Sequence, residues 1–219
     1  MPATRAHLIW NPVAGRRPER RRQQVEAIAA ELVRGGWQIE LAATTPDGGA
    51  GPAAGAAVRS GCDVILGCGG DGTLHEIVNA VMTLPPPHPA LGVVAFGTAN
   101  ILAHATGCAV PPRRAAAWLL QARPMARPLG MARPGNGPDN GQRYFLAVTS
   151  AGLDAQVVHT MTLAFKRRWG KLAYAGSALA QARRYFPAPI EFECGATRSS
   201  ADGIILGLSR YYGGRLKLG

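Results

Sequence analysis

The sequence has few acidic residues and no apolar run long enough to cross a membrane. Its 13 Asp and Glu stand against 24 Lys and Arg, which gives a formal net charge of +11. No apolar stretch approaches the roughly 20 residues that a membrane-spanning helix needs. Residues 1–10 also lack the long apolar core of a signal peptide. These absences predict a globular, cytoplasmic protein that does not span a membrane.

Cysteine is scarce as well, and Cys62, Cys68, Cys108 and Cys194 are scattered along the chain. They form neither a CxxC pair nor a His-containing metal spacing. The pattern therefore favours a reducing compartment. It also favours small buried hydrophobic roles for the four thiols over redox or metal chemistry.

The excess of positive charge favours acidic partners, such as nucleotide phosphates, anionic lipid surfaces or nucleic acid. A general bias toward Ala, Arg, Gly and Pro explains the same charge equally well. Charge by itself therefore assigns no partner.

Two common nucleotide-binding patterns are excluded by what is missing around them. Residues 67–72 satisfy G-x-G-x-x-G, but a dinucleotide-binding fold expects an acidic residue about 20 positions later. No Asp or Glu occurs between Glu76 and Asp139. A Walker A loop is missing too, because Gly170-Lys171 is followed by Leu172 instead of Ser or Thr.

Apolar strands alternate with helical patterns through the first half of the chain. We expect strands at residues 6–10, 37–43, 63–66 and 91–96, and helices at 18–34, 50–60, 73–82 and from Asn100 onward. This alternation predicts an α/β fold with a doubly wound, mostly parallel sheet and helices on both faces. In such a fold ligands bind at the carboxyl ends of the strands.

A Pro- and Gly-rich stretch after Arg123 indicates a domain boundary. We therefore predict an α/β nucleotide-binding domain at residues 1–124 and a β-rich second domain at 125–219. Strands are expected in the second domain at 144–149, 190–193 and 204–208, and a basic, aromatic helical segment at 165–186.

The strongest local pattern is the run Gly67-Cys68-Gly69-Gly70-Asp71-Gly72-Thr73, between an apolar strand and a helix. Glycines let the backbone approach phosphate oxygens closely, and the amides at a helix start point toward an anion. The run therefore predicts a phosphate-binding loop. A tight strand-to-helix turn without a ligand is the alternative.

Two further loops are predicted at the same edge of the sheet: residues 11–15, followed by Arg16 and Arg17, and residues 97–100. Both combine a glycine with side chains that can hydrogen-bond phosphate or ribose. Thr44-Thr45 with Gly48-Gly49 could form a fourth wall of the same cleft, but a plain surface turn explains them just as well.

In this order, the motifs N-P-x-x-G, G-G-D-G-T-L-x-E and G-T-x-N resemble the diacylglycerol kinase catalytic-domain family. That family includes bacterial lipid kinases and shares a superfamily with sphingosine kinases and NAD kinases. The resemblance rests on GGDGTLHEIVNAV at residues 69–81 and LGVVAFGTANILAHATG at 91–107. It extends to YFLAVTSAGLDAQVV and Tyr212-Gly213-Gly214, which resemble parts of the second domain.

The resemblance implies an ATP-dependent lipid kinase of phospholipid biosynthesis that phosphorylates diacylglycerol or a similar lipid. It also implies a cleft between the α/β domain and a sandwich-like second domain. The cofactor-binding residues that it implies are Asn11, Pro12, Val13, Ala14, Gly15, Thr44, Gly69, Gly70, Asp71, Gly72, Thr73, Leu74, His75, Glu76, Gly97, Thr98 and Asn100.

Asp71 is the predicted catalytic residue, because it is the acidic side chain held in the phosphate loop itself. Its carboxylate could accept the proton of the attacking lipid hydroxyl or bind the Mg²⁺ that offsets the phosphoryl charge. The metal ligands are otherwise unassigned. Capping of the helix that starts near Thr73 is the alternative role for Asp71.

Family members continue past the position of Gly214 into an Asp-Gly metal segment and a later acidic catalytic residue, and this sequence has neither. Asp202-Gly203 precedes Tyr212-Gly213-Gly214, so it is in the wrong order to replace them. We therefore expect a second domain that is incomplete at the C-terminus, in a fragment, a truncated product or a variant with weakened chemistry.

Cations mixed with Trp169, Tyr174, Tyr185 and Phe186 in residues 165–186 suit the headgroup layer of an anionic membrane. A solvated basic helix with inward aromatics explains the segment equally well. We expect peripheral membrane association and no nucleic-acid partner, because no recognised binding module surrounds the segment.

Two other functions stay open. An NAD-kinase-like enzyme shares G-G-D-G-T, although the loops at residues 11–15 and 97–100 argue against it. A nucleotide-binding protein without turnover is the third hypothesis, and it follows from the missing C-terminal segment.

Overall fold

The computed structural model describes residues 3–15, 17–46, 49–108, 110–135, 141–153, 155–156, 189–212 and 216–217. The chain divides into two compact units. Unit 1 comprises Met1–Ala132, Arg143–Ala147 and Ser209–Gly219, and unit 2 comprises Arg133–Gln142 and Val148–Leu208. A domain boundary after residue 124 stays a prediction.

A four-stranded parallel sheet forms the centre of unit 1, in the order β2-β1-β3-β4. Its strands are β1 (Arg5–Trp10), β2 (Gln38–Ala43), β3 (Val64–Gly69) and β4 (Ala90–Ala95). The apolar runs of β1 and β3 are buried, as expected of central parallel strands. Leu8 of β1 lies in register with Leu41 of β2 and Leu66 of β3.

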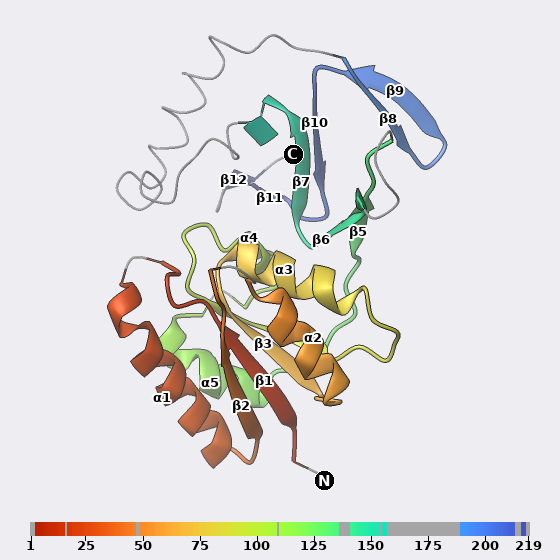
Figure 1. Cartoon of the computed structure of the whole chain (residues 1–219). Coiled ribbons are helices and arrows are strands. Elements are labelled where there is room, and N and C mark those ends of the chain that lie inside the picture. The colour runs from red at the N-terminus through yellow and green to blue at the C-terminus, as the bar shows by residue number, and fades with distance from the viewer. Residues whose placement is uncertain are drawn as a thin grey trace. The chain divides into compact units, whose positions relative to one another are not determined.

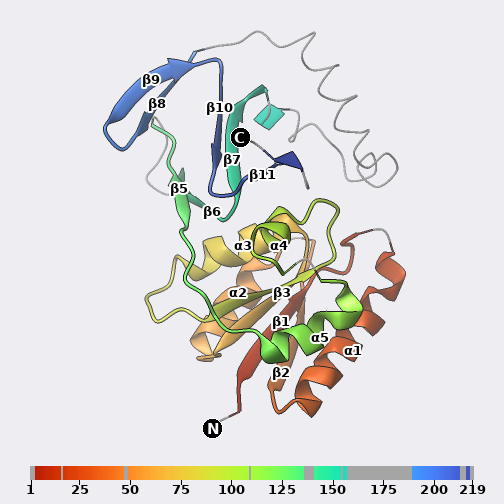
Figure 2. The same ribbon diagram turned by 180° about the vertical axis from the view of Figure 1, so that it is seen from behind.

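Helices cover both faces of this sheet (Figures 1 and 2). On one face lie α1 (Arg21–Arg34), which follows the short 3-10 helix η1 (Pro18–Arg20), and α5 (Pro112–Gln121). On the other face lie α2 (Gly51–Arg59) and α3 (Asp71–Val81), while α4 (Ile101–Ala105) follows β4. The predicted doubly wound α/β fold is confirmed. None of the helices in the described residues combines the length and apolar character needed to cross a membrane.

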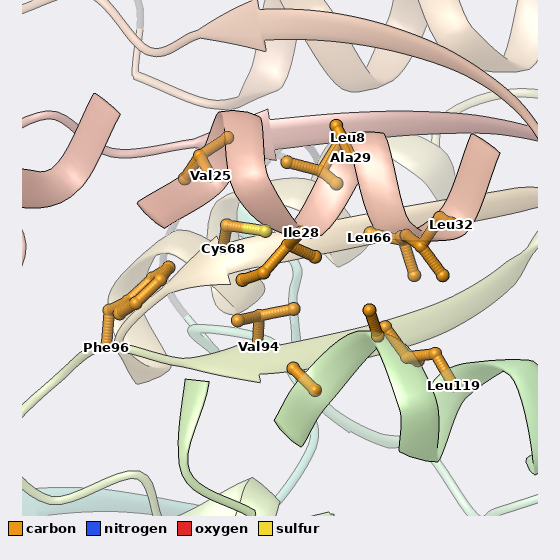
Figure 3. Close-up of a cluster of buried hydrophobic side chains, with 12 residues drawn as sticks. Leu8, Val25, Ile28, Ala29, Leu32, Leu66, Cys68, Val94, Phe96 and Leu119 are labelled. Carbon is orange, nitrogen blue, oxygen red and sulfur yellow. The ribbon is translucent and has the colours of Figure 1, made fainter. Parts of the chain in front are cut away.

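The largest core cluster lies between the sheet and the layer of α1 and α5 (Figure 3). Val25, Ile28 and Leu32 recur at helical spacing on α1 and are almost fully buried. Figure 3 shows them beside Leu66 of β3 and the other side chains of the sheet. Burying an aliphatic side chain of this size contributes roughly 1.5–3 kcal/mol.

The glycine run that predicts a loop lies mostly inside the sheet. Gly67 and Gly69 belong to β3, and α3 begins at Asp71, so only Gly70 lies between the strand and the helix. A β-carbon on Gly67 would collide with the Leu74 side chain of α3, and one on Gly69 would collide with Thr73. These glycines therefore let α3 pack closely on β3.

Unit 1 also contains two short antiparallel strand pairs. They are β5 (Gly130–Ala132) with β6 (Arg143–Phe145), and β11 (Tyr211–Tyr212) with β12 (Leu216–Lys217). Asn79 of α3 holds β6. Its Nδ2 donates to the Tyr144 carbonyl and its Oδ1 accepts the Tyr144 N–H, both at 2.9 Å.

The described part of unit 2 contains two antiparallel strand pairs. They are β7 (Val148–Gly152) with β10 (Gly203–Gly207), and β8 (Ile190–Cys194) with β9 (Thr197–Ala201). The predicted β-rich character of the C-terminal region is confirmed. The single strand expected at 144–149 is instead divided between β6 and β7. The basic, aromatic helix expected at 165–186 lies outside the described residues.

Candidate functional site

Four connections leave the carboxyl ends of the parallel strands. They include residues 11–15 after β1, residues 44–46 and 49–50 after β2, Gly70 after β3 and residues 96–100 after β4. Because all four strands are parallel, these connections share one edge of the sheet, where α/β proteins bind ligands. The predicted loops are thus brought together within unit 1.

The loop at residues 11–15 is a compact turn. Asn11 Oδ1 accepts the Val13 N–H at 3.0 Å, and the Asn11 carbonyl accepts the Ala14 N–H at 3.2 Å. Gly15 has φ +75°, and a β-carbon there would collide with the Phe96 carbonyl of the loop after β4. Glycine is therefore needed for both the backbone conformation and the close contact.

The start of α3 has no side-chain cap. The N-cap residue is Gly70, and among the described residues no side chain makes a capping hydrogen bond to the helix. The first-turn N–H groups of Asp71, Gly72 and Thr73 lack acceptors within the helix. Together with the positive end of the helix dipole, they form a donor site suited to an anion such as phosphate.

Glycines shape the space around this helix start. A β-carbon on Gly97 would lie 2.5 Å from the Gly70 Cα, so the loops after β3 and β4 touch through their backbones. A β-carbon on Gly72 would meet nothing within 4 Å. The helix start is therefore closed on the side of Gly97 and open beside Gly72.

Asp71 connects the loops after β3 and β4. Its Oδ1 accepts the N–H of Leu102 at 3.2 Å, so the carboxylate caps the start of α4. The alternative of capping its own helix is wrong, because α3 has no side-chain cap. Among the described residues, nothing hydrogen-bonds Asp71 Oδ2, and that oxygen is available to a proton or a metal ion.

Glu76 connects α3 to the start of α2. Its Oε2 accepts the Ala50 N–H at 2.7 Å and lies against Gly49. Thr44, at the end of β2, is held by a hydrogen bond from its N–H to the Trp10 carbonyl at 2.9 Å. The fourth connection is thus attached to the same edge of the sheet.

The other predicted residues differ in exposure. Val13, His75 and Thr98 are exposed to solvent, whereas Leu74 is only 2% exposed and packs in the core. Thr73 is buried, with its hydroxyl 3.5 Å from Asn11 Nδ2.

Asn100 adopts the left-handed conformation at φ 49°, which Asn tolerates better than most residues. Its Nδ2 donates to the Gly97 carbonyl at 2.9 Å and so closes the loop after β4. Pro12 lies in the turn at residues 11–15 and has no N–H to satisfy.

Two residues that the sequence patterns do not single out also join the loops. Arg21 donates from Nη2 to the Ala14 carbonyl at 2.7 Å, and its Cζ lies 3.7 Å from the ring centroid of Phe96. In the sequence Arg21 is one of several arginines between residues 16 and 22. Nothing in that run marks it as the buried one.

An uncapped helix start at the carboxyl edge of a parallel sheet is the arrangement by which α/β proteins bind phosphate groups. Residues 5–132 match the model of the diacylglycerol kinase catalytic domain, and the chain belongs to this family. The predicted family is confirmed.

The curated relatives that the chain resembles are bacterial proteins named as diacylglycerol kinases or probable lipid kinases. The chain is 31% identical over 193 residues to a diacylglycerol kinase of Bacillus subtilis (strain 168). This alignment covers 86% of the present chain and 59% of the Bacillus protein. It is 32% identical over 155 residues to a probable YegS-like lipid kinase of Stenotrophomonas maltophilia (strain K279a). This second alignment covers 69% of the present chain and 49% of that relative. The chain thus spans only part of the length of these curated relatives.

A solved structure supports the fold. The crystal structure of a diacylglycerol kinase from Bacillus anthracis str. Sterne matches with a TM-score of 0.69 at 21% identity, covering 96% of this chain and 68% of that chain. An identity this low shows the fold alone.

Proposed function

We propose that this chain carries the nucleotide-binding part of an ATP-dependent lipid kinase that phosphorylates a hydroxyl of diacylglycerol or a similar lipid. Membership of the lipid kinase family and the names of the relatives support this function. The observation that carries it is the meeting of three loops around the uncapped start of α3, with the contact between Gly70 and Gly97 at its centre.

The triphosphate would lie against the first-turn N–H groups of Asp71, Gly72 and Thr73. Backbone donors fixed by a packed helix suit phosphoryl transfer, because the protein's main task there is positioning and charge stabilisation. Thr98, which is exposed, would add a side-chain hydroxyl donor from the loop after β4.

Asp71 would be the catalytic carboxylate. The Leu102 N–H holds its Oδ1, which leaves Oδ2 to accept the hydroxyl proton or to bind Mg²⁺. The described part of the chain contains no cluster of three or more His, Cys, Asp or Glu side chains that could hold a metal ion. Mg²⁺ is often held by one or two carboxylates together with the phosphates of the substrate, and Asp71 would supply one such carboxylate. When bound, Mg²⁺ would neutralise charge on the phosphates.

The acceptor would be met at an anionic membrane surface on the cytoplasmic side, with the protein bound peripherally. The net charge of +11 supports this part of the proposal, since basic surfaces are attracted to anionic lipid.

The first test is transfer of phosphate from radiolabelled ATP to diacylglycerol in mixed micelles. Asp71→Asn should lower kcat by about a hundredfold or more, the range for loss of a general base. Asp63→Asn is the matched control, because that carboxylate accepts the Arg5 N–H at the opposite end of β3. Equal activity of Asp71→Asn and the unmodified chain would remove Asp71 from the mechanism.

Gly72→Ala tests the phosphate position separately from the chemistry. A methyl group at Gly72 meets no protein atom within 4 Å, so the fold should be unaffected. In a helix Ala is favoured over Gly by up to about 1 kcal/mol. We expect thermal stability to be retained while ATP affinity, measured by calorimetry, falls at least roughly tenfold, since every 1.4 kcal/mol is a factor of ten.

Gly55→Ala in α2 is the control for this substitution, since its β-carbon meets only the flexible end of Arg59. Unchanged ATP affinity in Gly72→Ala would contradict a phosphate at the start of α3. Binding of ATP without transfer would point to a nucleotide-binding protein without turnover. Transfer to NAD in place of lipid would point to an NAD-kinase-like enzyme.

A further inference from the structure

Arg21 is a buried cation in contact with the first loop of the candidate site. It is the first residue of α1 and only 5% exposed. In the described part of the chain, no carboxylate lies within ion-pair distance of its guanidinium. Burial lowers the pKa of Arg21, and Glu19 opposes this shift through its charge. An arginine in a protein nevertheless stays charged.

The guanidinium joins two of the loops. Nη2 donates to the Ala14 carbonyl at 2.7 Å, and Nη1 donates to Gln24 Oε1 at 2.8 Å. Cζ lies 3.7 Å from the centre of the Phe96 ring, which Figure 3 shows at one end of the buried cluster. Arg21 therefore holds the loop at residues 11–15 against the residue that begins the loop after β4.

The charge of Arg21 is not fully compensated where it lies. Its Nε is buried and has no hydrogen-bond partner. A buried charge without a counter-ion is costly, and the positive end of the α1 dipole adds to that cost. An anion bound at the adjoining loops would lower both the cost of burying the charge and the repulsion from the helix dipole. The fold thus places a cation that has no carboxylate partner among the described residues against the loop at residues 11–15, which is one of the loops of the candidate site.

We propose that Arg21 is a positioning residue for the polyphosphate of the nucleotide. It fixes the loop at residues 11–15 through Ala14 and Phe96, and its charge favours the phosphates over the nucleoside. This role rests on the proposed function, because it assumes that the triphosphate binds at this edge of the sheet.

The test compares the affinities for ATP and for adenosine, measured by calorimetry on the whole chain at constant salt. Arg21→Met keeps a long apolar side chain in this position and removes the positive charge and the N–H donors of the guanidinium. ATP affinity should fall roughly tenfold, since a hydrogen bond to a charged group contributes about 1.5–3 kcal/mol. Adenosine affinity should change little.

Three further variants separate the contributions of charge, guanidinium geometry and ring contact, and one of them is the control. Arg21→Lys keeps the charge but not the planar fork, so ATP affinity should lie between those of Arg21→Met and the unmodified chain. Phe96→Leu keeps an apolar side chain and removes the ring, and it should weaken ATP about threefold, in line with cation–π interactions of roughly 0.5–1 kcal/mol. Arg22→Met is the control, because Arg22 is exposed and paired with Glu26 at 2.8 Å.

The outcomes are separable. If the unmodified chain does not bind ATP, the proposed function itself is wrong. If it binds ATP and Arg21→Met lowers ATP and adenosine affinity by the same factor, Arg21 has only a structural role and the inference is overturned. Should Arg21→Met not fold, an unchanged ATP-to-adenosine ratio in both Arg21→Lys and Phe96→Leu would overturn it equally.

Discussion

The two units of the chain differ in how their strands are stabilised. In unit 1, central strands such as β1 and β3 are buried between helix layers. In the described residues of unit 2 no side chain is buried, and β10 exposes Ile205 by 46%. The loops of the candidate site are therefore held by packing within unit 1, and not by backbone pairing alone.

Cysteine reactivity should show the largest difference between the units. Cys68 of unit 1 is fully buried, and burial raises the pKa of its thiol, whereas Cys194 of unit 2 is exposed. Alkylation by iodoacetamide proceeds through an accessible thiolate. We expect Cys194 to react at least about a thousandfold faster, because Cys68 must wait for an opening that costs roughly 5 kcal/mol or more. Peptide mass spectrometry over time measures both rates, and comparable rates would contradict a closed core in unit 1.

Truncation of an aliphatic side chain should show the next largest difference. Leu66→Ala removes a side chain with no exposed surface and should lower the free energy of unfolding by about 2–5 kcal/mol. Ile205→Ala on β10 removes a half-exposed one and should cost less than roughly 1 kcal/mol. Denaturant titrations of the two variants give both values. Equal costs would mean that unit 2 has a core comparable to that of unit 1.

Loss of a side-chain hydrogen bond should show the smallest difference in stability cost between the two units. Asn79→Ala removes both hydrogen bonds to Tyr144, so it should cost about 1–3 kcal/mol at roughly 0.5–1.5 kcal/mol for each bond. Arg133→Ala in unit 2 removes an exposed bond to Gln142 and should change stability by less than about 0.5 kcal/mol. Thermal unfolding followed by circular dichroism measures both changes. A neutral Asn79→Ala would show that β6 is held by other contacts.

Much of the fold could be predicted because apolar runs and helical spacing are local signals. The run at 63–66 marks β3, and the spacing of Val25, Ile28 and Leu32 marks α1. The polar strand β9 gives no such signal, because it is defined by pairing with β8. The sequence predicts a loop at the glycines of β3, because their actual role, the close approach of α3, depends on a helix that only the folded chain places there.

The sequence by itself determined that three glycine-containing loops end parallel strands, and hence that they meet at one edge of a sheet. Only the tertiary structure decided what each charged side chain does there. Asp71 caps α4 rather than its own helix, Glu76 caps α2, and Arg21 lies buried against Phe96. The reason is that these partners are distant in sequence. Local propensities place a residue on an element, but the packing of helices on the sheet selects which hydrogen-bond donor or aromatic ring comes within reach.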